Sequence, residues 1–405
     1  MLCQFSVKNY KSIRDEMTLN MEAMDIDEHR ETLIEMNDGE RYLPLAVIYG
    51  ANGSGKSNVL EAMNTLVAKI VRPVEAIADR DEINYKRKLL IIPFAFAEDT
   101  KKSPTEFELF FRTEVAEYRY QLHLMKDVVM YESLSRRKCN TEEEDIETLF
   151  ERSCNGEIIL ARDLKRLQIS AEISETLPLL SYLGFTYRKN TVVNDVFEWL
   201  ENKIRFCTEN KLPRALRMMK DEKIKQLALQ MMNEMDIDIV DFRVEVNVNL
   251  FEVYVTHVVD EIKVELMLQD ESSGVQKIFE RLPFIAQSLA GGEVLVVDEL
   301  DVRMHPVLLR YIIQLYRDKN SNPHGAQLIF TSNELSTMTE EVFRRDEIWF
   351  VAQGRMQETK LYSLVEFKAL DDEGTLDKGN YDQKYLEGKY GAVPCSERIA
   401  NWRQR

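Results

Sequence analysis

Residues 50–57 read GANGSGKS, which fits the pattern G-x-x-x-x-G-K-[ST] in full. The glycines of such a loop allow the backbone to wrap a row of phosphates with its N–H groups turned inward. Lys56 is placed to neutralise the β- and γ-phosphates, and the hydroxyl of Ser57 is placed to bind Mg²⁺. We therefore predict an ATP and Mg²⁺ site formed by Gly50, Asn52, Gly53, Ser54, Gly55, Lys56, Ser57 and Asn58.

A pair of acidic residues follows the apolar run VLVV at residues 294–297. Asp298 is the expected partner of the magnesium ion, because phosphate-loop enzymes place an aspartate at the end of a neighbouring strand. Glu299 is next to it and is positioned to polarise an attacking water as general base. The alternative is a generic acidic strand end, which the complete phosphate loop disfavours.

Residues 270–279 read DESSGVQKIF, with Ser273 and Gly274 at the expected start of a helix. A hydroxyl and free N–H groups at a helix N-terminus form an anion site, and glycine lets a phosphate approach the backbone closely. An ordinary helix cap is the alternative for this stretch alone. Since one chain already has a phosphate loop for its ATP, a second anion site is most simply used across a dimer.

The elements that must position these residues follow from hydrophobic periodicity. A helix is predicted over residues 57–71, where apolar residues have helical spacing, and another follows Ser273. Residues 104–124 predict a hairpin with its turn at 113–117. Apolar runs and alternation predict further strands near residues 2–13, 42–50, 242–248, 251–257, 263–269, 293–301, 326–334 and 346–353.

The pattern of charged and apolar residues changes between residues 125 and 240, where short charged helices are expected. We predict that residues 1–124 form the N-terminal part of one nucleotide-binding core and residues 241–405 its C-terminal part. Residues 125–240 are then a mainly helical insertion between the two parts.

Composition limits the class of protein. The 405 residues carry 53 Lys and Arg against 70 Asp and Glu, a net charge of −17 that disfavours a protein whose main role is to coat nucleic acid. No apolar run is long enough for a membrane span and the start has no signal-peptide core, so we expect a cytoplasmic protein without a membrane partner. The five cysteines form no C-x-x-C pair and predict reduced thiols.

The order of the motifs resembles the ABC-type ATPase heads of the SMC and RecF kind. In that family a signature, usually L-S-G-G-Q, caps the γ-phosphate of ATP held by the other protomer. Here Ser273, Gly274 and Gln276 match it, whereas Ser272 and Val275 depart from it. The resemblance implies an α/β ATPase head, with a mixed central sheet, flanking helices and an antiparallel β portion, that forms a head-to-head dimer around ATP.

Four stretches look like the RloA/AbiL-type bacterial defence ATPases: NYKSI at residues 9–13, DELDVRMHP at 298–306, RRDEIWFV at 344–351 and YLEGKYGAVP at 385–394. In these relatives His305 lies in the D-loop that crosses the dimer interface; without the analogy it is a helix-capping residue. Asn333 stands where relatives have a His that contacts the γ-phosphate. Asn can donate a hydrogen bond but cannot carry a proton, so slow hydrolysis is expected. Gln121 is a candidate for the Q-loop glutamine.

These resemblances favour an ATPase that regulates a separately encoded effector, such as a Toprim-like or other nuclease, in defence against phage. The main alternative is a DNA-repair or DNA-clamping ATPase like RecF, which the acidic balance disfavours. A transporter subunit is a third reading, and the long segment between Lys56 and Ser273 argues against it.

Overall fold

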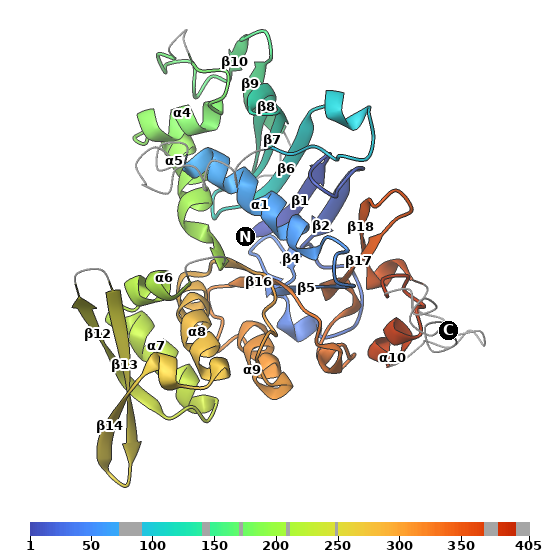
Figure 1. The fold of residues 1–405 in the computed structure, drawn as a ribbon. Coiled ribbons are helices and arrows are strands. Elements are labelled where there is room, and N and C mark those ends of the chain that lie inside the picture. The colour runs from blue at the N-terminus through green and yellow to red at the C-terminus, as the bar shows by residue number, and fades with distance from the viewer. Residues whose placement is uncertain are drawn as a thin grey trace. The chain divides into compact units, whose positions relative to one another are not determined.

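The computed structural model describes residues 1–72, 91–139, 146–169, 173–207, 211–247, 250–367 and 380–393. The chain divides into two compact units, one formed by Met1–Ile204 with Met338–Arg405 and the other by Arg205–Thr337. Both units combine helices with strands, which confirms the predicted α/β class (Figure 1). Among the helices that the structure describes, none is long and apolar enough to cross a membrane.

The first unit contains an antiparallel sheet with the strand order β10-β9-β8-β7-β6-β1-β2. Every second residue of β7 is buried, as expected for a strand with one face in the core. The predicted first strand and the predicted hairpin over residues 104–124 are confirmed. The strands are β1 (Leu2–Lys8), β2 (Met17–Asn20), β6 (Thr105–Arg112), β7 (Ala116–Met125), β8 (Val128–Lys138), β9 (Ile146–Ser153) and β10 (Ile158–Leu160).

This sheet continues into the segment that was predicted to be a mainly helical insertion from residue 125. Strands β8, β9 and β10 occupy its first part, and its helices begin only at Leu179. The charged residues of β8 are the reason that this strand was not predicted, since charged residues usually indicate a solvated segment. Here Glu132 and Arg136 are buried and hydrogen-bonded instead. The helices of the segment are α4 (Leu179–Thr186), α5 (Thr191–Glu198), the π-helix η3 (Trp199–Lys203), α6 (Lys211–Met218) and α7 (Glu222–Glu234).

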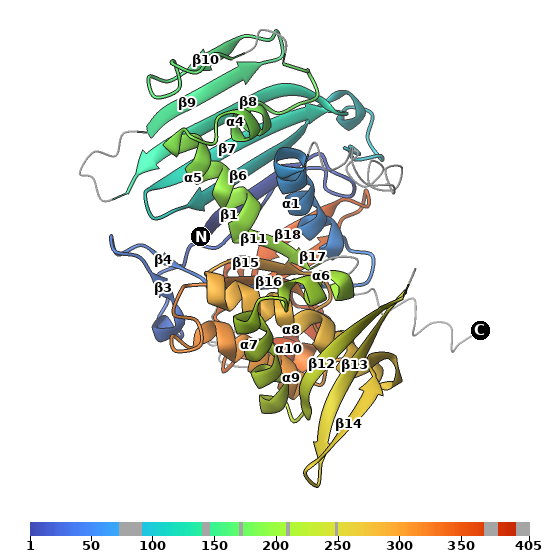
Figure 2. The same cartoon turned by 90° about the vertical axis from the view of Figure 1, so that its left-hand side faces the viewer.

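Helices α1 (Lys56–Val71), α4 and α5 cover one face of the sheet (Figure 2). Phe111 of β6 stacks on Trp199 with ring centroids 4.3 Å apart, and the Tyr118 hydroxyl of β7 donates to Asp195 of α5 at 2.8 Å. These contacts pack α5 and η3 against the sheet.

A second group of strands in the first unit leads to the phosphate loop. Strand β5 (Leu45–Gly50) is buried along its whole length and pairs in parallel with β17 (Ile348–Gln353). Strand β17 then pairs antiparallel with β18 (Thr359–Ser363). The predicted strands near residues 42–50 and 346–353 are thus confirmed. Smaller elements are η1 (Arg30–Thr32), β3 (Ile34–Glu35), β4 (Arg41–Tyr42), η2 (Thr100–Lys102), η6 (Arg345–Glu347), η7 (Leu364–Glu366) and α10 (Tyr381–Leu386).

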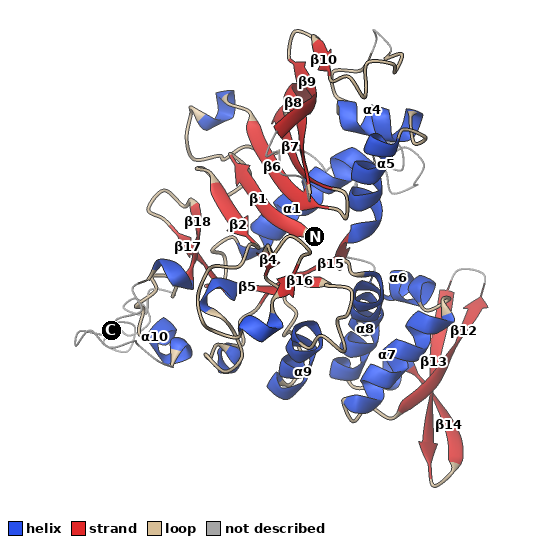
Figure 3. Ribbon diagram, turned by 180° about the vertical axis from the view of Figure 1, so that it is seen from behind, coloured by secondary structure: helices blue, strands red, loops and turns tan. Residues whose placement is uncertain are grey.

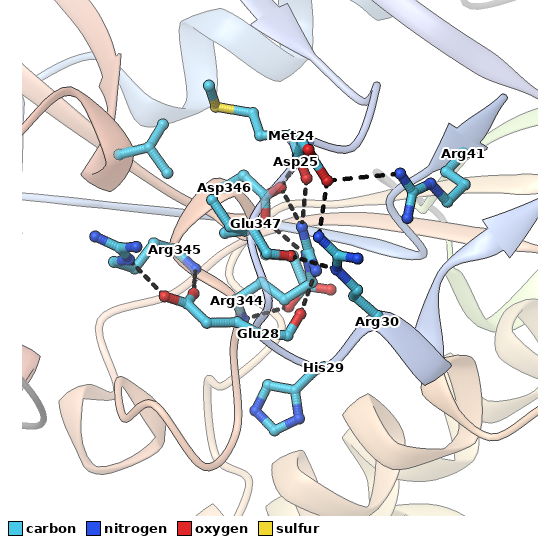
Figure 4. A network of polar contacts seen from close by, with 12 residues as sticks. Met24, Asp25, Glu28, His29, Arg30, Arg41, Arg344, Arg345, Asp346 and Glu347 are labelled. Atoms are coloured by element: carbon cyan, nitrogen blue, oxygen red, sulfur yellow. Dashed lines mark hydrogen bonds and ion pairs between the residues drawn. The ribbon is translucent and has the colours of Figure 1, made fainter.

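The start of β17 is anchored by Arg344, which is completely buried (Figure 4). Its guanidinium donates to both carboxylate oxygens of Asp346, at 2.9 and 2.7 Å, and to the carbonyl oxygens of Met24 and Glu28. The Met24 N–H in turn donates to Asp346 at 2.9 Å. Because the buried ions are paired and hydrogen-bonded, removal of one partner would leave the other uncompensated.

The second unit contains a parallel strand pair, β15 (Val294–Val297) and β16 (Gln327–Thr331), which confirms two predicted strands. Strand β15 is shorter than predicted, because it ends before Asp298. Helix α8 (Ser273–Gly291) begins at Ser273 as predicted, and α9 (Pro306–Arg317) follows β15. The single turns η4 (Leu268–Asp270) and η5 (Leu335–Thr337) belong to this unit, and β11 (Ile204–Cys207) runs across the sequence boundary between the units.

An antiparallel sheet of β12 (Ile239–Asn247), β13 (Leu250–Val259) and β14 (Ile262–Met267) also belongs to the second unit, with β13 in the middle. The three predicted strands over residues 242–269 are confirmed, although Val248 lies outside the described residues. Figure 3 shows α7 beside β12 and the β13–β14 hairpin extending beyond the helix.

Candidate nucleotide site

The predicted phosphate loop connects the end of β5 to the start of α1 in the first unit. Gly53 and Gly55 have φ of +82° and +106°, in the left-handed region that favours glycine. A Cβ atom on Gly50 would collide with the carbonyl oxygen of Val351, and one on Gly55 with the hydroxyl of Thr359. The loop therefore requires glycine for both backbone conformation and space.

The loop has free hydrogen-bond donors where phosphates would bind. Within the described ranges, the N–H groups of Gly53, Gly55 and Ser57 have no acceptor in the chain. They lie at the N-terminus of the 16-residue helix α1, where the helix dipole favours an anion. The Ser54 hydroxyl is buried without a hydrogen-bond partner. These donors fit a polyphosphate.

Lys56 is largely buried, and its ammonium lies across the loop. Its Nζ donates to the carbonyl oxygen of Gly50 at 2.6 Å and is 3.4 Å from that of Ala51. Ser57 is exposed at the first turn of α1. The lysine is thus held at the loop by carbonyl groups that a phosphate can replace.

A series of hydrogen bonds between side chains, which the sequence analysis did not identify, supports the loop. Thr359 donates from its hydroxyl to the Ser54 carbonyl at 2.9 Å, and the Ser12 hydroxyl lies 2.6 Å from that of Thr359. Asn58 donates from Nδ2 to the Ser12 hydroxyl at 2.6 Å. Since a hydroxyl has one proton, the bonds run in one direction, from Asn58 through Ser12 and Thr359 to the loop. The side chain of Asn58, predicted to bind nucleotide, is therefore engaged in support of the loop.

The acid pair lies at the end of β15 in the second unit. Asp298 accepts a hydrogen bond from the Thr331 hydroxyl at 2.6 Å, and that hydroxyl accepts from the Glu299 N–H at 2.7 Å. In the described part of the unit, the other carboxylate oxygen of Asp298 has no partner, which leaves it available to a cation. Glu299 is exposed, with a φ of +52° that turns the chain sharply after the strand.

Arg281 of α8 braces the segment that follows the acid pair, and no sequence motif indicated it. Its buried guanidinium donates to the carbonyl oxygens of Glu299 at 2.8 Å, Leu300 at 2.7 Å and Val302 at 3.2 Å. Burial lowers the pKa of Arg281, whereas the nearby Cys207 and Asp301 act in the opposite direction. An arginine side chain still remains protonated in proteins, so a cation holds these carbonyl groups.

The signature-like turn is built at the start of α8. Ser272 is the N-cap and accepts from the Val275 N–H at 3.2 Å, which places Ser273 in the first turn. Ser273 is exposed and, among the described residues, has no side-chain hydrogen-bond partner. Gln276 donates to the carbonyl oxygens of Glu271 at 2.8 Å and Gln269 at 3.2 Å, so its side chain is engaged within the turn.

His305 and Asn333 occupy exposed positions in the second unit. His305 caps α9 by accepting from the Val307 N–H at 3.3 Å, which is the structural role expected without the family analogy. The Asn333 N–H donates to Asp301 at 3.1 Å, so its backbone is tied to the segment after Glu299. Gln121 lies in strand β7, where its side chain bonds to Glu108 and Ser133.

Residues 45–333 match the family described as "AAA domain, putative AbiEii toxin, Type IV TA system". The chain belongs to this AAA-domain family. The matched range includes the phosphate loop, the signature-like turn, the acid pair and Asn333. No protein of curated function is a significant match to the sequence.

Several solved SMC heads resemble the AAA-domain chain, all with low sequence identity. The "SMC head domain from Thermotoga maritima" is 12% identical with a TM-score of 0.43, and the match covers 89% of this chain and 98% of that one. The Smc head domain with a coiled coil and joint from Pyrococcus yayanosii is 10% identical with a TM-score of 0.46, and the match covers 96% and 99%. An SmcHead bound to the C-winged helix domain of ScpA is 13% identical with a TM-score of 0.42, covering 89% and 97%.

Proposed function

We propose that this AAA-domain protein binds ATP with Mg²⁺, hydrolyses it slowly and associates with a second copy around the nucleotide. The observation that carries the proposal is the glycine loop at the start of α1, whose Gly53, Gly55 and Ser57 N–H groups have no acceptor among the residues that the structure describes, with the Lys56 ammonium beside it. A loop of this shape binds phosphates with backbone donors, a helix dipole and one cation together.

The proposed roles follow from the chemistry of each side chain. Lys56 neutralises the terminal phosphates, and Ser57 and Asp298 hold Mg²⁺, which would stabilise the charge that develops on the phosphate oxygens. Glu299 polarises the attacking water, and Arg281 and Thr331 fix the backbone on both sides of that residue. Asn333 donates a hydrogen bond where relatives use His, and it holds no proton for the reaction, which supports slow turnover.

Calorimetric titration of ATP with Mg²⁺ tests this assignment. The Lys56→Ala protein should lose about 1.5–3 kcal/mol of binding free energy, because a charge-assisted contact to phosphate is removed. Lys69→Ala, on the same helix but paired with Asp127, is the matched control and should bind as the wild type does. Equal affinity of Lys56→Ala and wild type would overturn the site.

Glu299→Gln separates hydrolysis from binding. The change keeps size and polarity but removes the base, so turnover should fall roughly 10²- to 10⁴-fold while ATP affinity stays within about twofold. Phosphate release and calorimetry measure the two quantities. Normal turnover would assign the base to another residue.

We further propose that the ATPase regulates a separately encoded effector, such as a Toprim-like or other nuclease, in cytoplasmic defence against phage. The support is the resemblance of four sequence stretches to RloA/AbiL-type ATPases, together with a family description that names a toxin of a type IV system. Co-purification with the product of a neighbouring gene, and loss of phage resistance in Lys56→Ala, would test it. DNA-stimulated hydrolysis would instead favour the RecF-like alternative.

A further inference from the structure

Strand β14 leaves one edge of the β12–β14 sheet open. The strand order places β14 at the edge of this sheet (Figure 1). Its residues are exposed along almost the whole strand. Its pairing with β13 is continuous, without a bulge, and it contains no proline. The opposite edge strand, β12, has a bulge between Ile239 and Asp241. Natural proteins commonly block open edges with prolines, bulges or charged side chains, and β14 has charged side chains but neither a proline nor a bulge. Its backbone can therefore pair with a strand that supplies charges of opposite sign.

The turn before β14 determines which backbone groups face outward. Asp260 and Glu261 form a two-residue turn with φ of +48° and +66°, which is the type I′ pattern. In such a turn the flanking residues Val259 and Ile262 bond to each other. Since bonding alternates along an antiparallel pair, the N–H and C=O groups of Lys263 and Glu265 point away from β13.

One face of the β13–β14 hairpin carries exposed apolar side chains. Val259, Ile262, Val264 and Leu266 share this face and are 59%, 66%, 40% and 44% exposed. Nearer to the helices the same face is covered, since Val255 is fully buried there and Phe242 contacts Phe279 of α8. Contiguous exposed apolar side chains mark an interaction surface.

We propose that β14 pairs antiparallel with β14 of a second copy of this chain, with Val264 on the two-fold axis. Lys263 of each copy then lies opposite Glu265 of the other, and the outward backbone groups of these residues exchange both of their hydrogen bonds. Ile262 lies opposite Leu266 of the second copy on the apolar face. The two sheets become one continuous sheet, and the exposed apolar side chains of both copies lie on the same face.

Charge selects this register among those that the backbone allows. Only odd-numbered residues of β14 present outward groups, so a shift of the axis by one residue places Lys263 opposite itself or Glu265 opposite itself. Like charges directly opposite each other destabilise a strand pair, whereas opposite charges stabilise it. Glu265 also accepts from Arg243 at 2.9–3.0 Å, and a carboxylate has enough lone pairs for a further donor.

This contact is independent of nucleotide and goes beyond the ATP-driven dimer proposed above. Light scattering on the full chain without nucleotide, over the micromolar range, should give the mass of two chains. Lys263→Glu and Glu265→Lys each place like charges opposite each other, so each variant alone should show a twofold fall in mass. An equal mixture of the two variants restores both opposite-charge pairs, and the two-chain mass should return.

The matched control is Glu245→Lys, which reverses a charge on β12 and removes a contact to the same Arg243. It should keep the two-chain mass, as should Lys56→Ala, whose loss of ATP binding is measured separately. Recovery on mixing excludes misfolding of the single variants. A wild-type protein with the mass of one chain, single variants that keep the two-chain mass, or a mixture that stays monomeric would each overturn the proposal without affecting the nucleotide site.

Discussion

Arg281 connects the helix of the signature-like turn with the backbone of the proposed general base. Its three hydrogen bonds reach Glu299 and two residues that follow it, and the side chain is buried. Glu299 itself is exposed and has a backbone conformation that is uncommon for a residue other than glycine. Arg281 is therefore a positioning residue, because it acts on the carboxylate only through the chain that carries it.

Replacement of Arg281 by Met should lower the turnover number roughly 10- to 100-fold, since a displacement of a catalytic group by about an ångström has an effect of this size. ATP affinity, measured by calorimetry, should change little, because Arg281 contacts the segment after Glu299 and not the phosphate loop. Arg281→Lys keeps the cation and should recover part of the turnover. A purely structural role would instead lower thermal stability with no selective loss of turnover.

At the scale of elements, α4 depends on a carboxylate supplied by a neighbouring strand. The helix begins after Pro178, which offers no side-chain cap. Glu132 of β8 accepts instead from the N–H groups of Leu179 at 2.6 Å and Leu180 at 2.8 Å, and from the Tyr120 hydroxyl at 2.9 Å. Burial raises the pKa of Glu132 despite these donors. The carboxylate thus joins the helix to the sheet at the cost of desolvation.

We expect Glu132→Ala to lower the free energy of unfolding by about 2–4 kcal/mol, because buried N–H groups lose their acceptor. Glu132→Gln keeps one acceptor oxygen and should lose about 1 kcal/mol at neutral pH.

The raised pKa of Glu132 means that the folded protein binds the proton of this carboxyl group more tightly than the unfolded chain does. The contribution of Glu132 is therefore largest at low pH and is lost as pH rises through that pKa. In urea unfolding, the free energy of unfolding of the wild type should rise relative to that of Glu132→Gln as the pH falls from 7 to 5. An opposite trend would contradict a raised pKa.

Local patterns predicted the elements whose side chains pair with near neighbours in sequence. The phosphate loop, the hairpin of β6 and β7 and the start of α8 at Ser273 all follow from spacing within a few residues. Strand β8 was not predicted, because its charged residues are paired inside the unit and resemble a solvated face in the sequence. Arg281, Thr331 and Thr359 could not be identified either, since each acts on a segment distant in sequence.

At the scale of the whole molecule, the signature-like turn predicts cooperation between chains. Ser273 is exposed and makes no side-chain hydrogen bond to any described residue, so its replacement removes no such bond from the described part of the chain. Ser273→Arg should keep ATP binding but prevent ATP-driven association, because the longer side chain fills the space that the other copy's γ-phosphate needs. In a Lys263→Glu background, where the β14 contact is absent, light scattering reads this association alone.

Mixing Ser273→Arg with Lys56→Ala provides the complementary measurement. Each variant alone lacks a complete site, whereas a mixed dimer combines an intact phosphate loop with an intact signature and contains one complete site. ATPase activity should therefore recover partially on mixing. If, in the Lys263→Glu background, Ser273→Arg abolishes ATP binding and the protein stays monomeric, the turn acts within its own chain and the ATP-driven dimer proposal fails.

The bond from Thr359 to the Ser54 carbonyl joins residues 305 positions apart in the sequence. Val351 packs against Gly50 across a similar separation, and Arg344 ties the same late segment to residues near the N-terminus. A ribosome makes the glycine loop first, and it adds the side chain that supports this loop only after the roughly 300 residues between them. Nascent chains therefore carry the motif long before they carry a finished phosphate site. ATP can stabilise the protein only after translation has passed Thr359, which leaves the early chain to fold without its nucleotide.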